Sequence, residues 1–132
     1  ELNSLGDGSN KITSTALSND AASTERNLFA DFSLSIAAQA SARDYGGTVD
    51  LYIIPEVDGV YAYGGDSLDP SPQHFRGAFA YDQSTSSRVD ILEGVRLPNS
   101  DYHVLLINRT GQALAASGNV LKIEAYSGYE DA

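Results

Sequence analysis

The sequence contains no cysteine, no methionine and no tryptophan, and it contains only two histidines. The absence of cysteine excludes a disulfide framework, a thiolate metal site and a cysteine nucleophile. With two histidines, general acid–base chemistry at neutral pH has few candidate residues. Because a translated chain begins with methionine, and glutamate is a poor second residue for its removal, we expect further residues to precede Glu1.

Basic side chains are also scarce: 8 Lys and Arg stand against 18 Asp and Glu, which gives a formal net charge of −10. Nucleic-acid binding depends on Lys and Arg that neutralise phosphates, so this balance argues against direct contact with nucleic acid and with anionic membranes. No segment approaches the roughly 20 apolar residues of a spanning helix. The charge fits a basic protein partner, although a solvated acidic surface is the more common explanation.

The chain has 132 residues, of which 42% are apolar and 20% are charged. This length supports one hydrophobic core rather than two, so we expect a single folded domain. The first 27 residues are mostly small and polar, and their only large apolar residues are Leu2, Leu5, Ile12 and Leu17. We therefore predict an extended, polar N-terminal arm over 1–27, able to order on a neighbouring molecule, and one domain over 28–132.

From residue 28 onward, apolar residues recur at every second position, which is the period of a strand with one buried face. The alternating sets are Phe32, Leu34 and Ile36; Val49, Leu51 and Ile53; Phe75, Phe79 and Tyr81; and Leu121, Ile123 and Ala125. Residues 102–108 are apolar on both faces, so we predict a central strand there. Asp58-Gly59 predicts a tight type I′ hairpin turn, and Pro55 predicts the end or the edge of a strand.

A helical repeat of apolar residues does not persist anywhere after residue 28, and the alanine-rich stretches are too short for independent helices. Residues 63–73 carry several Gly, Pro and Asp and predict a long loop. Turn signals recur about every ten residues along the rest of the domain. We therefore predict an all-β, antiparallel β-sandwich of six to eight strands.

Catalytic chemistry finds little support. His74 and His103 fall in separate predicted strands, and no Gly-x-Ser-x-Gly nucleophile elbow accompanies them. Most carboxylates lie beside Gly, Ser or other turn residues, where water keeps them ionised, whereas a catalytic acid needs an apolar pocket. We therefore predict no catalytic residue and no enzymatic activity.

Two short acidic segments, 7–10 (DGSN) and 66–69 (DSLD), offer oxygen ligands for calcium. Neither completes a twelve-residue calcium loop, and turn formation accounts for the same residues, so we predict no metal and no cofactor. Asn108-Arg109-Thr110 is formally a glycosylation acceptor, but only in a protein secreted by a eukaryote.

The aromatic residues are strongly biased, with eight tyrosines and no tryptophan. Several flank turns or strand ends, namely Tyr61, Tyr63, Tyr81, Tyr126 and Tyr129. A tyrosine in such a place covers apolar neighbours while its hydroxyl reaches water, an arrangement found in protein interfaces and on sugar-binding platforms. Because tryptophan is missing, a protein contact is the better supported of the two.

Four segments of the domain carry a resemblance to a known family. They are 48–55 (TVDLYIIP), 58–61 (DGVY), 97–98 (LP) and, most specifically, 108–121 (NRTGQALAASGNVL). The region from Leu28 to Tyr126 resembles a group of small tailed-bacteriophage virion proteins that decorate, or cement, the capsid. The resemblance implies a jelly-roll-like fold, a homo-oligomer such as a dimer or a trimer, and a place on the outer surface of the capsid, in contact with the major capsid protein.

The expected partner contacts combine the apolar residues of the arm with the tyrosines and carboxylates of the hairpin and loop. They are Leu2, Leu5, Ile12, Tyr61, Tyr63, Asp66 and Asp69. The alternative hypothesis is a carbohydrate-binding β-sandwich module. In that module Tyr61, Tyr63 and Tyr81 stack on sugar rings, and Asp66 and Asp69 accept hydrogen bonds from sugar hydroxyls.

Overall fold

The computed structural model describes residues 2–19 and 27–126, and within these ranges the chain is all-β, without an α-helix. The eight strands are β1 (Asn10–Ile12), β2 (Phe29–Ile36), β3 (Thr48–Val57), β4 (Val60–Tyr61), β5 (Phe75–Ala80), β6 (Arg88–Arg96), β7 (Asp101–Arg109) and β8 (Val120–Tyr126). One 3₁₀ turn, η1 (Pro72–His74), precedes β5. The predicted fold class is confirmed.

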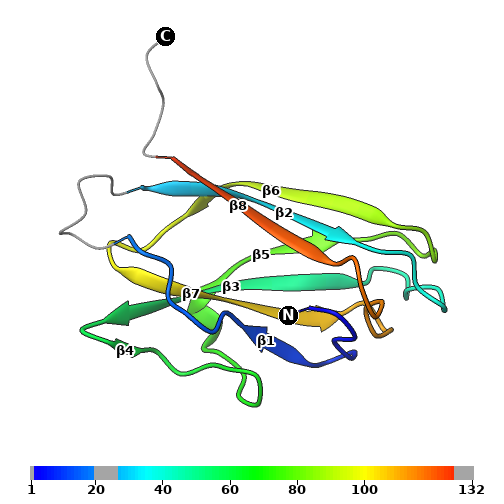
Figure 1. Ribbon diagram of the computed structural model, residues 1–132, viewed down its shortest axis with the longest axis horizontal. Helices are drawn as coiled ribbons and strands as arrows, with labels where there is room; N and C mark the ends of the chain where they lie inside the picture. The colour runs from blue at the N-terminus through cyan, green and yellow to red at the C-terminus, as the bar shows by residue number, and fades with distance from the viewer. Residues whose placement is uncertain (1, 20–26, 127–132) are drawn as a thin grey trace, which may run out of the picture.

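The strands form two antiparallel sheets that pack face to face (Figure 1). The first sheet has the order β1-β7-β3, and both β4 and β5 pair with the remaining edge of β3. The second sheet has the order β6-β2-β8. Apart from β3, β4 and β5, successive strands alternate between the two sheets, which gives a jelly-roll-like β-sandwich.

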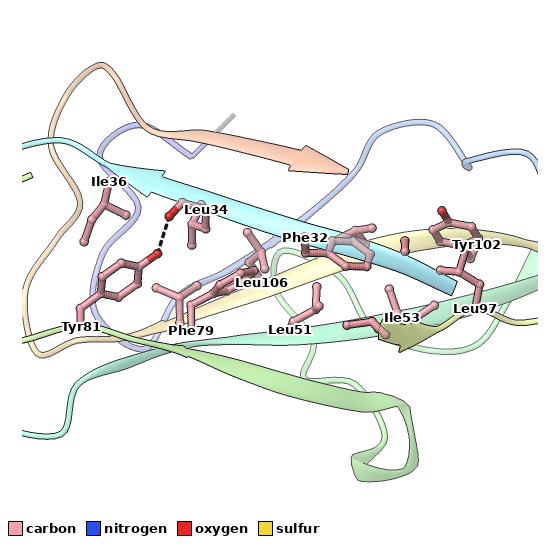
Figure 2. Packing of buried hydrophobic residues seen from close by; sticks show 14 of the residues in the cluster. Phe32, Leu34, Ile36, Leu51, Ile53, Phe79, Tyr81, Leu97, Tyr102 and Leu106 are labelled. Atoms are coloured by element: carbon pink, nitrogen blue, oxygen red, sulfur yellow. Dashed lines mark hydrogen bonds between the residues drawn. The ribbon is translucent and has the colours of Figure 1, made fainter. Parts of the chain in front are cut away.

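The core lies between the two sheets and is built by the alternation seen in the sequence. Phe32, Leu34 and Ile36 point from β2 toward Leu51 of β3 and Phe79 of β5 (Figure 2). All five side chains are buried. Burial of each such side chain contributes about 1.5–3 kcal/mol, so this interface holds the two sheets together.

Strand β7 is central, as its composition predicts. It pairs with β1 on one side and with β3 on the other, and all its residues from Tyr102 to Asn108 are buried. Leu105 and Ile107 face away from the second sheet and form a smaller apolar cluster with Ile54. The outer face of the first sheet is therefore covered as well.

The hairpin between β3 and β4 also follows the prediction. Asp58 and Gly59 both adopt a positive φ, 51° and 80° respectively, as a type I′ turn requires. Pro55 does not end β3, which continues through it to Val57, so that part of the prediction is wrong. The carbonyl of Pro55 accepts a hydrogen bond from Ala62, so its ring nitrogen faces the same side, away from the ladder with β7.

Strand β5 differs from the expectation at its start. Phe79 is buried in the core, but Phe75 is exposed on the opposite face and contacts the ring of Tyr52. The register with β3 shifts between Leu51 and Tyr52, beside Gly77, whose φ of 154° belongs to a bulge. An extra residue in one strand reverses the side to which the preceding residues point. His74, predicted in a strand, lies in η1.

The described part of the N-terminal segment, residues 2–19, lies along the domain rather than apart from it. Strand β1 pairs with β7, and the Leu17 amide donates to the Tyr102 carbonyl over 2.7 Å. Leu2 and Leu5 pack against the core between the sheets. This differs from an arm that is free to order on a neighbour, because its few apolar residues dock on their own domain. Residues 20–26, next to the predicted boundary, lie outside the described ranges.

Candidate interaction surface

The β3–β4 hairpin and the loop before β5 lie together on the side of the first sheet that faces away from the second sheet (Figure 1). Between residues 57 and 75 this segment exposes six large apolar side chains. They are Val57, Val60, Tyr61, Tyr63, Leu68 and Phe75, which we call the hairpin–loop surface. Val60 is 74% exposed and Tyr63 is 58% exposed. Exposed apolar side chains gathered on one segment make it a candidate contact site.

The hairpin is anchored to the sheet through His103 of β7. The Nδ1 of this buried histidine donates to the Thr13 carbonyl over 2.8 Å, and its Nε2 lies 3.2 Å from a carboxylate oxygen of Glu56. The ring of Tyr61 lies 4.5 Å from the imidazole, centroid to centroid. Tyr61 therefore packs on a buried histidine while almost half of it remains exposed, and His103 has a structural explanation.

The carboxylates of the loop connect it to β1. Asp66 accepts a hydrogen bond of 2.9 Å from the Ile12 amide and pairs with the Lys11 ammonium at 3.4 Å. Asp69 accepts a hydrogen bond from the amide side chain of Asn10. The structure thus brings the two predicted carboxylates to one place, where turn and edge contacts account for them.

Asp66 also makes the attachment of the loop sensitive to pH. The hydrogen bond from the Ile12 amide, aided by the charge of Lys11, holds the pKa of this carboxyl below its usual value of 3.8. A carboxyl whose pKa is lowered by folding stabilises the folded state above its unfolded pKa. That contribution is lost as the pH falls through the folded pKa.

We therefore expect the free energy of unfolding of the parent chain to fall below about pH 4. The Asp66→Asn variant should lose less unfolding free energy between neutral pH and about pH 3. The measurement is urea unfolding of both proteins near neutral pH and at about pH 3. The difference in unfolding free energy between the two pH values should be smaller for the variant. An equal difference in both proteins would contradict a role for Asp66.

The remaining predicted contact residues lie elsewhere. Leu2 and Leu5 are partly buried against the core between the sheets, and Ile12 packs against the smaller cluster on the outer face. Contacts within the chain therefore account for these three side chains. A part for them in an external contact stays a prediction.

The other tyrosines divide into buried and exposed positions. Tyr81, a proposed sugar-stacking residue, is buried and donates from its hydroxyl to the Leu34 carbonyl over 2.8 Å, so that assignment is wrong (Figure 2). Burial raises the pKa of the Tyr81 phenol. Tyr126 stacks on Phe29, whereas Tyr45, which the sequence did not single out, is 90% exposed. Tyr129 lies outside the described residues.

Sequence reasoning also missed Val57, Val60, Leu68 and Phe75 of the hairpin–loop surface. The signal for the two valines was present, because they flank the Asp58-Gly59 turn at a hairpin tip. Strand β4 has only two residues, so it is too short to cover the valine side chains at the hairpin tip. The exposure of Phe75 had no such signal, since it depends on the bulge in β5.

The other candidate chemical sites have structural explanations. Asp7 accepts a hydrogen bond from the Gly111 amide, and no three acidic or histidine side chains of the described residues form a metal-binding group. Burial, aided by the charge of Arg76, lowers the pKa of His74. Asn108, the formal glycosylation acceptor, is fully buried, so its side chain is inaccessible in the folded protein. The described residues include no helix that qualifies as a candidate membrane span.

Three comparisons, with models of protein families, with curated proteins and with solved structures, found no match to this chain.

Proposed function

We propose that this chain is a structural protein of a tailed-bacteriophage virion, which binds the outer surface of the assembled capsid. There it contacts neighbouring copies of the major capsid protein and stabilises the shell. The observation that carries the proposal is the hairpin–loop surface, a group of exposed apolar and aromatic side chains held on a rigid sandwich. The major capsid protein is proposed as the partner of this surface because residues 28–126 resemble capsid decoration proteins.

The composition of the surface supports a protein partner. Tyrosine is enriched in protein interfaces because a rigid, amphipathic ring buries a large area at a low cost in conformational entropy. Around Tyr61 and Tyr63 the same segment carries the acidic residues Asp58, Asp66 and Asp69. The whole chain carries a net charge of −10. These acidic residues therefore favour binding to a partner surface that is basic.

The mechanism of stabilisation is mass action combined with multivalency. A ligand that binds the assembled state and not the free subunits shifts the equilibrium toward assembly. A module that touches two neighbouring subunits makes their separation break its own contacts as well. A rigid β-sandwich suits this task, because little conformational entropy is lost when it binds.

We expect Tyr61→Ser combined with Tyr63→Ser to weaken binding to assembled shells by about a hundredfold, since two interface tyrosines at hot-spot positions each contribute roughly 1–2 kcal/mol. Co-sedimentation with shells of the phage that encodes the chain, at a series of protein concentrations, measures the effect. Tyr45→Ser is the matched control, because Tyr45 is 90% exposed in the turn before β3. Equal binding by all three proteins would refute the assignment of this surface.

Tyr61 also contacts His103, so its removal weakens the anchor of the hairpin. Tyr63→Ser alone separates the two effects, because Tyr63 is more exposed. The thermal unfolding midpoint of this single variant should stay close to that of the parent protein while its binding falls. Binding to free capsid subunits should be much weaker than binding to shells.

The carbohydrate-binding alternative keeps one specific observation in its favour. Tyr63 is exposed on the loop that also presents the partly exposed carboxylate of Asp66. An aromatic ring near a carboxylate can hold a sugar, but without Tyr81 the predicted platform loses one of its three rings. A glycan array with the full chain distinguishes the two functions, because selective sugar binding that Tyr63→Ser removes would favour this alternative.

A further inference from the structure

The strand edges of the two sheets are not equally protected. At β1, Asp66 accepts a hydrogen bond from the outward-facing Ile12 amide. At β5, Asp90 of β6 accepts one from the Ala80 amide over 2.8 Å. A carboxylate on an edge amide blocks the addition of another strand there, because it occupies the hydrogen-bond donor and repels the incoming carbonyl.

Strand β8 lacks such protection. It pairs only with β2, and within the described residues no side chain caps the backbone of residues 120–125 on the other edge. The edge is seven residues long and contains neither proline nor glycine. The outer edge of β8 is therefore able to accept another strand.

An apolar groove lies beside this edge. It has a volume of about 350 Å³, and its apolar lining includes Leu2, Leu17, Leu106, Leu121 and Ile123. Leu121 and Ile123 come from β8 itself and are only partly buried, while Val120 at the start of the strand is 46% exposed. An added strand would remove apolar surface from water as well as satisfy backbone groups.

The side chains of β8 indicate which strand fits. Lys122 and Glu124 project from the solvent-facing side of the sheet, on either side of Ile123. In an antiparallel pair of two β8 strands related by a two-fold axis at Ile123, Lys122 of each copy lies directly opposite Glu124 of the other. If the two-fold axis lay at residue 122 instead, Lys122 of one copy would face Lys122 of the other. If it lay at residue 124, Glu124 would face Glu124. The charges therefore select one register, since like charges directly opposite each other are destabilising.

We propose that two copies of this chain associate through their β8 edges in that register. The second sheets of the two copies then form one continuous six-stranded sheet, with β8 of each copy at its centre. The interface is isologous, as expected for a two-fold dimer, and it brings together the apolar Ile123 side chains of both copies. The dimer uses the β8 edge rather than the hairpin–loop surface, so it stands independently of the proposed capsid function.

Charge reversal tests the pairing without touching the core. Lys122→Glu and Glu124→Lys each replace two attractive cross-strand pairs with two repulsive ones. Each should raise the dimer dissociation constant by about tenfold or more at low ionic strength. The double variant restores the opposite-charge pairs and should return the dissociation constant to near that of the parent protein. Sedimentation equilibrium of the full parent chain and of the three variants, over a dilution series, measures these dissociation constants.

Two exposed charges away from β8 provide matched controls. Arg96→Glu and Glu93→Lys in β6 make the same changes in net charge and should leave the dissociation constant unchanged. A parent protein that stays monomeric at the highest soluble concentration would overturn the proposal. So would a dimer that is insensitive to both single reversals, or a double variant that is weaker than either single one.

Cysteine cross-linking reads the register directly, because the chain has no cysteine of its own. Residues directly opposite in an antiparallel pair are within disulfide distance, whereas diagonal neighbours at roughly 7–8 Å are too far apart. A mixture of Lys122→Cys and Glu124→Cys proteins should therefore form a disulfide-linked heterodimer on oxidation. Efficient cross-linking of either variant with itself would show a different register and overturn the assignment.

Discussion

Replacement of Arg43 by methionine is expected to lower the free energy of unfolding by about 3 kcal/mol. Arg43 lies between β2 and β3, and its guanidinium is buried although it carries a full charge. Its Nη1 donates to the side-chain oxygen of Gln39 over 2.6 Å, and its Nη2 donates to the Ser86 carbonyl and to the Asp82 carboxylate. The side chain thus fastens the loop after β2 to the loop after β5.

The cost of this substitution comes from the groups that lose their donor. Methionine fills most of the volume of the arginine side chain but donates no hydrogen bond, so the Gln39 oxygen and the Ser86 carbonyl are left without it. An unsatisfied buried polar group costs about 1–3 kcal/mol. Asp82 adds less, because its carboxylate is half exposed and keeps Arg88 as a partner.

Arg88→Met is the matched control, because Arg88 and Arg43 bind the same carboxylate. Hydrogen bonds from Arg43 first and then from Arg88 hold the pKa of Asp82 below its usual range. Arg88 is exposed, so its removal should cost less than about 1 kcal/mol. Urea unfolding at neutral pH compares the two variants, and a loss for Arg88→Met as large as that for Arg43→Met would contradict the importance of burial.

The sequence predicted those parts of the fold that local alternation determines. In β2 and β3 the apolar positions occur at every second residue, and the buried positions follow them. The continuous apolar character of β7 correctly placed it at the centre of a sheet. The Asp58-Gly59 turn was predictable too, because few dipeptides tolerate two successive positive φ values.

Features that depend on distant partners could not be predicted from the sequence. The bulge beside Gly77 is a property of the β3–β5 pair, and it turns Phe75 outward against the local pattern. Tyr81 resembled the exposed tyrosines in its position beside a turn, yet Leu34, on the other sheet, provides a buried acceptor. Arg43 gave no signal at all, since its partners Asp82 and Ser86 lie about forty residues further along the chain.

The candidate site was predicted only in part, because some of its contacts are local in the sequence and others join distant segments. Tyr61, Tyr63 and the two loop carboxylates lie in one hairpin and one loop, so their proximity follows from short sequence distances. The contact between Asp66 and Ile12 joins segments 54 residues apart and required the structure. It changes the interpretation of the opening segment, because β1 and the loop hold each other in place.

Replacement of Asn108 by alanine is expected to lower the free energy of unfolding by about 3 kcal/mol and to loosen the N-terminal segment. Asn108 lies near the end of β7 and is fully buried. Its side-chain nitrogen donates to the carbonyls of Leu5 and Gln112 over 2.9 and 2.8 Å, and its side-chain oxygen accepts from the amide and the hydroxyl of Thr110. One side chain thus closes the turn after β7 and holds residue 5 against it.

The local consequence distinguishes this prediction from a general loss of stability. If Asn108 holds the N-terminal segment, amides near Leu5, such as those of Ser4 and Gly8, should exchange hydrogen faster in Asn108→Ala under conditions where the core amides of β3 stay protected. Asn99→Ala, in the exposed turn before β7, should change neither stability nor exchange. Unaltered exchange at Ser4 and Gly8 in Asn108→Ala would show that the segment is held without Asn108. The segment would then be anchored mainly through the pairing of β1 with β7 and the contacts of Leu2 and Leu5 with the core.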